Sequence, residues 1–495
     1  MMYGEEKSDS LIVAANLANN PQGAESVERR SGAKGNAEQP HMRRTQSRES
    51  MSQRLSRVRE AAKQRKKERF TALFHLLTAE ALENAFLSLS RKAAAGVDGV
   101  RWKDYAENLK VNIADLHRRL HQGSYRAQPG RRHYIPKADG KQRPLGIASL
   151  EDKIVQYALV KILNAVYEND FMGFSYGFRP GRSQHNALDA LATGLVRTNV
   201  NWVLDADISQ FFDKVSHEWL IRFIEHRIGD QRVIRLIRKW LTAGTSEEGE
   251  WRASEEGTPQ GAVISPLLAN IYLHYVFDLW AHQWRRRHAT GNVVMVRYAD
   301  DIVIGFDKRI DAQCFRIAMQ RRLKEFGLTV HPKKTRLMEF GRFAAENRAS
   351  RGKGKPETFN FLGFTHISGK DRSGRFMLIR KTRRDRMTAT LKAIKDGLRK
   401  RWHYSIPEQG KRLRRVVQGY LNYHSVPGNY PMMRKFRIYV TDLWRRALRR
   451  RSQQDDTTWT KANRLAAVWL PKVRVLHPWP VERFTARHPR QEPGA

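Results

Sequence analysis

Hydrophobic positions along the chain follow helical spacing in some segments and strand-like spacing in others, without a regular alternation of the two. Apolar residues recur every three to four positions in 71–93 and 265–284, which predicts helices. Runs rich in β-branched and aromatic residues predict strands at 132–136, 201–208, 292–298 and 301–306. This irregular order favours an α+β fold over a doubly wound parallel sheet.

Beyond residue 364 the pattern predicts a module of amphipathic helices. Each helix is marked by apolar residues on one face, which are Met387, Leu391, Ile394 and Leu398 in the first, Leu413, Val416, Val417, Tyr420 and Leu421 in the second, and Phe436, Tyr439, Val440, Leu443, Trp444 and Leu448 in the third. Residues 380–415 hold 14 Lys and Arg against 3 acidic residues, so the opposite faces are strongly cationic.

The N-terminal segment, residues 1–69, predicts a mobile basic leader. Its single aromatic residue, Tyr3, and its polar composition leave too little apolar surface to order it alone. Residues 54–70 combine good helix formers with many cations. This stretch fits either a helix that orders on a phosphate backbone or a solvated basic helix.

The charge balance indicates an anionic partner. The chain has 495 residues with 91 Lys and Arg against 50 Asp and Glu, and a net charge of +41 favours a nucleic acid. A single cysteine, Cys314, excludes an internal disulfide and a Cys-based zinc site, and points to a reducing compartment such as the cytoplasm. No signal peptide or membrane span is expected, and no membrane partner.

Two of the predicted strands carry aspartates amid apolar residues. Asp300 and Asp301 stand in "VRYADDIVIGF", where a hairpin turn is the simplest reading. Asp205, Asp207 and Asp213 stand in "WVLDADISQFFD", and the first two share a strand face, so composition does not choose between them.

If the two strands lie side by side, their carboxylates meet. Two such charges ~4 Å apart repel by about 4 kcal/mol at an effective dielectric near 20, which favours a bound cation. Oxygen ligands without His or Cys favour Mg²⁺, with Mn²⁺ as the alternative. A pair of these ions is the apparatus of in-line phosphoryl transfer, and the basic chain points to a polynucleotide substrate.

Further cations and glycines suit phosphate contacts. The segment 133–147 predicts a hairpin turning at Asp139-Gly140, whose Lys137, Lys141 and Arg143 suit either a triphosphate clamp or a solvated surface. In "GTPQGAVISP", Gly257 and Gly261 would let backbone approach a ligand closely, although the stretch otherwise reads as a helix entry. Arg179 and Arg182 in "SYGFRPGRSQHNAL" also suit phosphate contacts.

Several motifs together resemble the group II intron reverse transcriptase and maturase family. "YADD", "DADISQFFD" and "GTPQGAVISPLLANIYL" resemble the palm of reverse transcriptases. "AAAGVDGV", "HYIPKADGKQRPLGI", "SYGFRPGRS", "HPKKTRLMEF", "FNFLGF" and "GYLNYHSVPGNY" match that family in order, over roughly residues 85–450.

The resemblance implies roles for individual residues in the catalytic part. Asp207, Asp300 and Asp301 would bind two metal ions, and strand alternation predicts Asp300 as the direct ligand and Asp301 as the peripheral one. Phe212 would be the steric gate against a ribose 2′-hydroxyl. Lys334 would protonate the leaving pyrophosphate. The implied nucleotide contacts are Lys137, Lys141, Arg143, Gln260 and Gly261.

The resemblance also implies an architecture of right-hand polymerase type. Fingers and a palm with an antiparallel sheet would span 70–365, and a helical thumb and maturase domain 366–450, followed by a basic tail, 451–495. Arg179, Arg182, Gly419, Tyr420, Tyr423 and His424 would contact RNA, although helical spacing alone makes the last three aromatic residues core. The lack of a Cys cluster predicts no zinc-bound endonuclease domain.

The implied function is an RNA-directed DNA polymerase that also binds group II intron RNA and assists its splicing and mobility. Its partners would be the intron RNA, an RNA template with a DNA primer, dNTPs and target DNA, in a bacterial cytoplasm or nucleoid. Two other functions stay open: an RNA-binding splicing factor with secondary polymerase activity, and a domesticated reverse transcriptase in phage defence or DNA repair.

Overall fold

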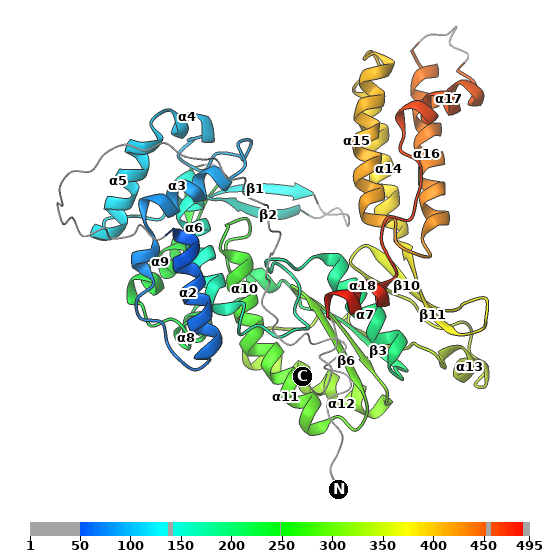
Figure 1. Cartoon of the computed structure of the whole chain (residues 1–495), viewed down its shortest axis with the longest axis horizontal. Coiled ribbons are helices and arrows are strands. Elements are labelled where there is room, and N and C mark those ends of the chain that lie inside the picture. Colours follow the sequence, from blue (N-terminus) through cyan, green and yellow to red (C-terminus); the bar gives the residue numbers. More distant parts are fainter. Residues whose placement is uncertain (1–49, 137–141, 248, 452–456, 489–495) are drawn as a thin grey trace, which may run out of the picture.

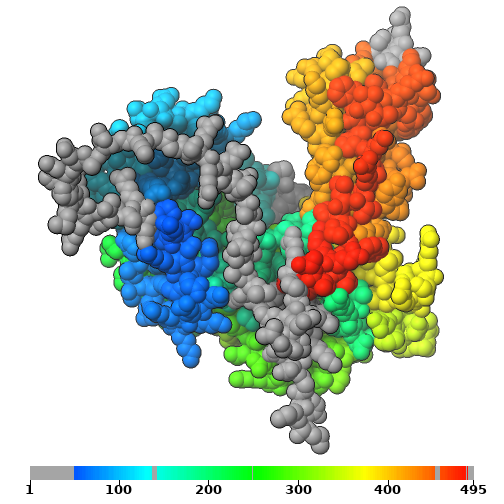
Figure 2. Space-filling view, viewed as in Figure 1, coloured from blue at the N-terminus to red at the C-terminus, as the bar shows by residue number. Residues whose placement is uncertain are grey.

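The computed structural model describes residues 50–136, 142–247, 249–451 and 457–488. Helices and short strands of the N-terminal half lie beside a central sheet, and the helices within residues 384–449 form an upright module (Figure 1). Figure 2 shows the blue N-terminal part and the orange helical module on opposite sides of the molecule. None of the described helices is long and apolar enough to cross a membrane.

The central sheet has the order β6-β7-β3-β8, and all its strands run antiparallel to their neighbours. It confirms the predicted strands, with β3 at Trp202–Asp207, β6 at Val293–Tyr298 and β7 at Asp301–Phe306, and adds β8 at Arg336–Glu339. Helix α7 (Gln184–Arg197) packs against β6, and α12 (Arg309–Glu325) packs against β3 and β7. Because these helices cover the sheet, almost every residue of β6 and β7 is apolar.

The N-terminal half surrounds a second sheet of order β2-β1-β4-β5. The predicted hairpin arms are β1 (Gly130–Pro136) and β2 (Gln142–Ile147), which pair antiparallel, while β1 also pairs in parallel with β4 (Thr245–Glu247), which continues to β5 (Glu250–Arg252). The tip of the hairpin, with Lys137 and Lys141, lies outside the described residues.

The helix expected over 71–93 is divided in two. A short η1 (Phe74–Leu76) comes first, and α3 (Ala79–Ser88) begins after Thr78, whose hydroxyl accepts a hydrogen bond from Ala81 N at 3.2 Å. Threonine is a favoured residue before a helix, and its cap supplies the break that apolar spacing did not show.

The end of the expected leader is part of the fold. Helix α2 (Met51–Gln64) packs against α6 (Leu150–Tyr167), and Ala62 is fully buried. Arg227 donates to the carbonyl oxygens of Arg65 at 3.0 Å and Glu68 at 2.6 Å. The prediction of a mobile leader through residue 69 is therefore wrong for its last part, because this buried arginine fixes the segment from inside the molecule.

The three predicted amphipathic helices are α14 (Arg384–Arg399), α15 (Ile406–His424) and α16 (Tyr430–Arg449). They are preceded by a sheet of β9 (Phe359–Phe361), β10 (Phe364–Lys370) and β11 (Phe376–Thr382), which the sequence did not predict. Phe364 and Leu378 of this sheet belong to the large core below, whereas α14–α16 enclose a smaller core of their own.

The last described residues fold back along the molecule instead of forming a free tail. Helix α17 (Trp459–Trp469) packs on α15 and α16, and α18 (Pro480–Arg487) returns to α7, as the red segment of Figure 1 shows. The remaining elements are α4 (Trp102–Glu107), α5 (Leu109–Gln122), η2 (Phe211–Asp213), α8 (His217–Glu225), α9 (Gln231–Thr242), α10 (Ser265–Leu273), η3 (His274–Asp278), α11 (Leu279–His288) and α13 (Ala344–Ala349).

Candidate active site

The aspartates of the two sequence motifs meet at one end of the central sheet. Strands β3 and β7 pair so that Asp207 lies directly opposite Asp301. Side chains of directly opposite residues in an antiparallel pair lie on the same face. Asp205 lies two residues back along β3, opposite Val303, so the register selects Asp207 as the partner of Asp301.

Asp300 lies in the tight turn between β6 and β7, where Tyr298 pairs with Asp301. The preceding Ala299 has φ 57°, a left-handed conformation that costs a residue with a Cβ roughly 1–2 kcal/mol. Since Asp300 is outside the regular strand, alternation along a strand does not apply to it. The assignment of Asp300 as the direct ligand and Asp301 as the peripheral one stays a prediction, but strand alternation no longer supports it.

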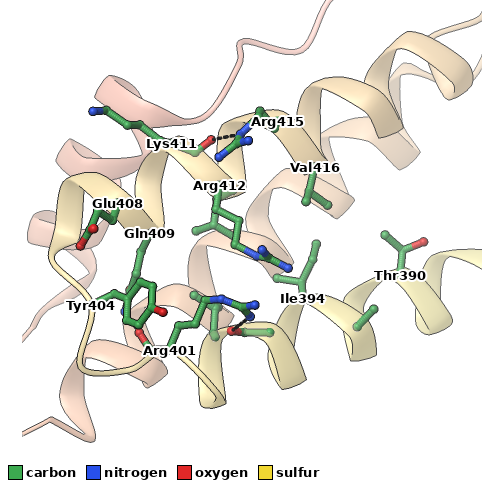
Figure 3. Close-up of a pocket in the computed structure, with 14 residues that line it drawn as sticks. Thr390, Ile394, Arg401, Tyr404, Glu408, Gln409, Lys411, Arg412, Arg415 and Val416 are labelled. Carbon is green, nitrogen blue, oxygen red and sulfur yellow. Dashed lines mark hydrogen bonds between the residues drawn. The ribbon is translucent and has the colours of Figure 1, made fainter. Parts of the chain in front are cut away.

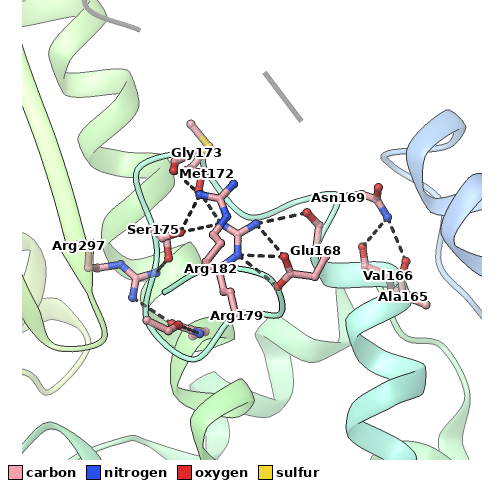
Figure 4. Close-up of polar contacts among 12 residues, drawn as sticks. Ala165, Val166, Glu168, Asn169, Met172, Gly173, Ser175, Arg179, Arg182 and Arg297 are labelled. Carbon is pink, nitrogen blue, oxygen red and sulfur yellow. Dashed lines mark hydrogen bonds and ion pairs between the residues drawn. The ribbon is translucent and has the colours of Figure 1, made fainter. Parts of the chain in front are cut away.

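A buried arginine supports this turn from behind. Arg297 donates to the carbonyl oxygen of Ala299 at 3.0 Å and pairs with Asp278 through Nε at 2.7 Å and Nη2 at 2.5 Å. Both side chains of the pair are fully buried. Arg297 also donates to Asn270 and to Ser175, and Figure 4 shows its guanidinium turned toward Ser175. The turn that carries Asp300 is thus tied to three separate segments.

The geometry behind the turn depends on a helix irregularity and a glycine. Asp278 ends η3, a π-helical turn between α10 and α11, a feature frequent at functional sites. Gly177, whose carbonyl accepts from Asn270 at 2.7 Å, lies against the turn so closely that a Cβ would collide with the backbone nitrogen of Ala299.

The carboxylates carry negative charge that the surrounding protein balances only in part. Burial raises the pKa of Asp301 to about 6, with Asp300 and Asp207 adding to the effect and Lys334 opposing it. Burial and the nearby Asp207 also raise the pKa of Asp300. Burial likewise raises the pKa of Asp205 to about 7.

Lys334 provides one cation at this end of the sheet. Its Nζ lies 2.6 Å from Asp207 Oδ2, and 62% of its side chain is exposed. The backbone holds the segment in place, because His331 N donates to the carbonyl oxygen of Asp207 at 2.7 Å. The structure therefore brings Lys334, which the sequence singled out over Lys333, to the aspartates.

The predicted nucleotide contacts Arg143, Gln260 and Gly261 come together beside the aspartates. Arg143 Nε donates to Gln260 Oε1 at 3.0 Å, and Gln260 Nε2 donates to Asp213 Oδ1 at 2.5 Å. Gly261 has φ 108°, and its missing Cβ leaves room for the carbonyl oxygen of Gly146. The GTPQG loop is thereby fastened to β2 on one side and to the residue after Phe212 on the other.

Phe212 is half-buried beside an exposed aromatic side chain. Its ring lies edge-on to Phe178, with 6.4 Å between ring centroids, and Phe178 lies at the same centroid distance from Tyr298 of the catalytic turn. Phe178 is 49% exposed and has φ 59°. Phe178 therefore connects the predicted gate residue to the end of β6, next to the turn that carries Asp300.

Arg179 and Arg182, for which the sequence predicted RNA contacts, both donate hydrogen bonds within the protein. Arg179 pairs with Glu168 at 3.0 Å and donates to the carbonyl oxygens of Met172 and Ser175, with 1% of its side chain exposed (Figure 4). Arg182 donates to the carbonyl oxygens of Gly173 and Ser175. The RNA-contact prediction is wrong for Arg179, because its guanidinium is used up inside the protein, and the same loop engages Arg182.

The aromatic residues of the 419–424 stretch are also mostly internal. Tyr420 is buried and stacks on Phe436 with ring centroids 3.6 Å apart, and His424 is buried against Phe364. Tyr423 donates its hydroxyl to the carbonyl oxygen of Leu362 at 2.8 Å. Of the four predicted contacts in this stretch, Gly419 is exposed and Tyr423 is half-buried. The alternative interpretation, that these aromatic residues are core, fits better than direct RNA contact.

The described residues contain no ready-made cluster of three His, Cys, Asp or Glu side chains around a cation position. Asp207, Asp300 and Asp301 nevertheless suit divalent metal binding, because they gather hard oxygen ligands whose mutual repulsion a cation relieves. Mg²⁺ usually takes only one or two protein carboxylates and completes its shell with water and substrate phosphates. An incomplete protein shell is therefore compatible with such ions.

Comparison with known proteins agrees with this geometry. Residues 135–366 match the family model described as reverse transcriptase (RNA-dependent DNA polymerase). Over 223 residues, 44% of this chain and 37% of the relative, the chain is 37% identical to the group II intron-encoded protein LtrA of Lactococcus lactis subsp. cremoris. Residues 135–366 thus match a reverse transcriptase domain, and the chain is similar to a group II intron-encoded protein.

Two further proteins are similar to this chain at slightly higher identity. Protein YkfC of Escherichia coli strain K12 is 43% identical over 206 residues, 41% of this chain and 54% of that protein. An uncharacterized 91 kDa protein in the cob intron of Schizosaccharomyces pombe is 42% identical over 172 residues, 34% of this chain and 21% of that protein. The chain thus spans about half of YkfC and less of the other two relatives. Reverse transcriptases generally use divalent metal ions, in agreement with the carboxylate site.

The sequence did not predict the residues that hold the candidate active site in shape. Arg297, Asp278 and Gly177 support the turn, and Gly146 receives the GTPQG loop. One signal was present: Arg297 interrupts a run of Val, Met and Tyr, and a charged residue at a buried strand position requires a partner. Nothing in the sequence identified Asp278 as that partner.

Proposed function

We propose that the chain is an RNA-directed DNA polymerase of a group II intron that also binds the intron RNA and assists its splicing and mobility. The observation that carries this proposal is the register of β3 and β7, which sets Asp207 opposite Asp301 at the base of the turn bearing Asp300. In this proposal the central sheet is the palm, β1 and β2 belong to the fingers, and α14–α16 form the thumb and maturase domain.

The residues around the carboxylates support a nucleotidyl-transfer mechanism. Two Mg²⁺ ions bound by Asp207, Asp300 and Asp301 would activate the primer 3′-hydroxyl and stabilise the departing pyrophosphate. Arg143, linked to Gln260 at 3.0 Å, has a planar guanidinium that suits the triphosphate of a dNTP. Lys334, with its ammonium at the carboxylates and exposed to solvent, is placed to donate a proton to that leaving group. Phe212 limits the space at the sugar.

The proposed partners are the intron RNA, an RNA template with a DNA primer, dNTPs and target DNA. A net charge of +41 and the cationic faces of α14 and α15 support binding to phosphate backbones. The similarity to LtrA, a group II intron-encoded protein, supports an intron RNA as the RNA partner.

The decisive experiment compares Asp300→Ala with the wild-type chain in two assays. Extension of a DNA primer on an RNA template should be abolished, because the turn loses the carboxylate nearest its tip. Binding of the same primer-template in the presence of Ca²⁺ should change less than about threefold, since phosphate contacts by cations dominate affinity.

The outcome separates the proposal from its rival. Substantial synthesis by Asp300→Ala would refute the catalytic assignment. A wild-type chain that promotes splicing of an intron RNA but extends no primer would instead favour the RNA-binding splicing factor. Asp371→Ala is the matched control, because this aspartate lies between β10 and β11, away from the site, and should leave synthesis unchanged.

A further inference from the structure

The upper part of the helical module contains a groove between α14 and α15 that the proposed polymerase mechanism does not use. It has a cavity volume of about 390 Å³. Figure 3 shows Ile394 of α14, Arg401 of the loop that follows α14, and Arg412 of α15 directed into the space between the two helices. Arg401 also donates to the carbonyl oxygen of Gly397 at 3.3 Å. Gly397, also in the lining, contributes no side chain, and only Arg412 comes as near as 4.0 Å to the place of its missing Cβ.

The chemistry of the groove combines an apolar floor with a cationic rim. Ile394, Leu398 and Leu413 form the floor and are buried in the core of the module. Arg401, Lys411, Arg412 and Arg415 surround it, and the part of the chain that the structure describes gives none of them a carboxylate partner within ion-pair distance. Unpaired cations beside apolar surface favour an occupant that is both anionic and partly apolar.

An aromatic side chain and an engaged acid narrow the choice of occupant. Tyr404, in the loop between α14 and α15, lines the groove and is 50% exposed, so its ring is free for stacking. Glu408, the acid in the lining, accepts from the hydroxyl of Ser405 at 2.7 Å and from its N–H at 3.1 Å, as the cap of α15. Its carboxylate is therefore already hydrogen-bonded at the helix end.

We infer that this groove binds an unpaired nucleotide of RNA, with the base against Tyr404 and the aliphatic floor and its phosphates on Arg401 and Arg412. An aromatic platform beside cations is the arrangement by which proteins bind single-stranded nucleic acids. A base is flat and apolar on its faces, and an acidic peptide or a free phosphate would leave the floor uncovered. The inference rests on the proposed RNA binding and assigns it a specific place.

The test fills the groove without altering its charge. Ala393 is exposed and lines the groove, whereas Ala389, one turn earlier on α14, is exposed but does not line it. Helical side chains lean toward the N-terminus, so a larger side chain at 389 points away from the groove. Ala393→Trp and Ala389→Trp therefore form a matched pair, compared by fluorescence anisotropy with a short labelled oligouridylate and with an RNA duplex of similar charge.

The expected result is a loss of about tenfold in oligouridylate affinity for Ala393→Trp, the equivalent of one stacked base, with Ala389→Trp within about twofold of wild type. Duplex affinity should change less than about twofold in both variants. Equal oligouridylate affinities in the two variants would overturn the inference. An equal loss on the duplex would also overturn it, because the groove would then be serving a paired helix.

A second variant guards against misfolding of the first. Tyr404→Ala removes an exposed loop ring and should weaken oligouridylate binding in the same sense, with a thermal unfolding midpoint close to that of wild type. Primer extension is measured on the same preparations. A wild-type chain that extends primers while Ala393→Trp and Tyr404→Ala bind oligouridylate normally rejects the groove alone, whereas a wild-type chain that neither extends primers nor binds RNA rejects the proposed function.

Discussion

Around the central sheet, Arg297, Arg179 and Arg227 are buried against carboxylates, whereas Arg412 and Arg415 on α15 reach solvent. In the first region an arginine joins segments that are distant in the sequence, and the carboxylates of the candidate active site are left to bind cations. In the second region the cations are left for an anionic partner. The same residue type thus builds the scaffold in one region and presents charge in the other.

The largest expected difference between the two regions is the loss of stability when one ion pair in each is broken. Asp278→Asn leaves Arg297 charged and fully buried, so we expect a loss of about 3–5 kcal/mol in the free energy of unfolding, together with loss of primer extension. Asp385→Asn breaks the pair with Arg383 at the start of α14, where the acid is 53% exposed, and should cost less than about 1 kcal/mol. Urea unfolding measures both, and equal losses would contradict the contrast.

A smaller loss of stability is expected from a substitution that displaces the turn carrying Asp300 but removes no charged side chain. In Gly177→Ala the new methyl group pushes against the backbone of Ala299, which should cost about 1–3 kcal/mol. A displacement of the carboxylates by ~1 Å should lower the rate on the order of a hundredfold.

The control for this glycine is Gly354→Ala, where a Cβ meets nothing within 4 Å. Its unfolding and its primer extension should match wild type. Normal extension by Gly177→Ala would show that the turn does not depend on this close approach. Titration of Mg²⁺ in the extension assay would report whether the residual activity needs more metal.

The junction between the two regions should respond to acid. Burial, reinforced by Arg380, lowers the pKa of His366 on β10 to about 3, whereas a histidine in the unfolded chain titrates near 6.5. Below that pH the unfolded state binds a proton that the folded state rejects. Stability should therefore fall as pH drops from about 6.5 toward 3, by about 1.4 kcal/mol per pH unit for this residue.

The variant His366→Phe should remove that part of the acid sensitivity, since Phe keeps the stack on Phe359. Thermal unfolding followed between pH 7 and pH 4 measures the slope. His403→Gln, in the exposed loop after α14, should leave the slope as it is in wild type. An unchanged slope in His366→Phe would remove this histidine from the acid response.

The smallest effect on stability is expected from single cations of the helical module. Lys395→Gln on the exposed face of α14 should change the free energy of unfolding by less than about 0.5 kcal/mol. If this cation contacts a phosphate, the slope of log affinity against log salt should fall by about 1. Lys353→Gln, exposed before β9, is the control whose slope should match wild type.

The sequence predicted those strands and helices whose buried positions are occupied by apolar residues. Apolar runs located β3, β6 and β7, and helical stripes located α14–α16. The β10–β11 hairpin was missed because its buried residues include His366 and Arg380, so the strands lack a visible apolar face. The break before α3 was missed because Thr78 caps the helix inside an otherwise helical pattern.

The site residues that were predicted correctly as neighbours all belong to short sequence motifs. Asp207, Asp300, Asp301 and Lys334 come together, as do Arg143, Gln260 and Gly261. Arg179 and Tyr420 were assigned to RNA and are buried, because a sequence shows that a side chain is cationic or aromatic but not which way it faces. Long-range partners such as Asp278 for Arg297 follow only from the three-dimensional packing.

The return of α18 to α7 has a consequence for how the protein is made. Arg483 forms an ion pair and paired hydrogen bonds with Asp189, residues that are 294 positions apart, so a helix beside the catalytic sheet obtains its partner only after most of the chain has been synthesised. Arg380, also paired with Asp189, arrives earlier. During translation, β6 and α7 can assemble long before this contact exists. We expect the region around the central sheet to become fully protected from proteases only when the segment around residue 483 has left the ribosome.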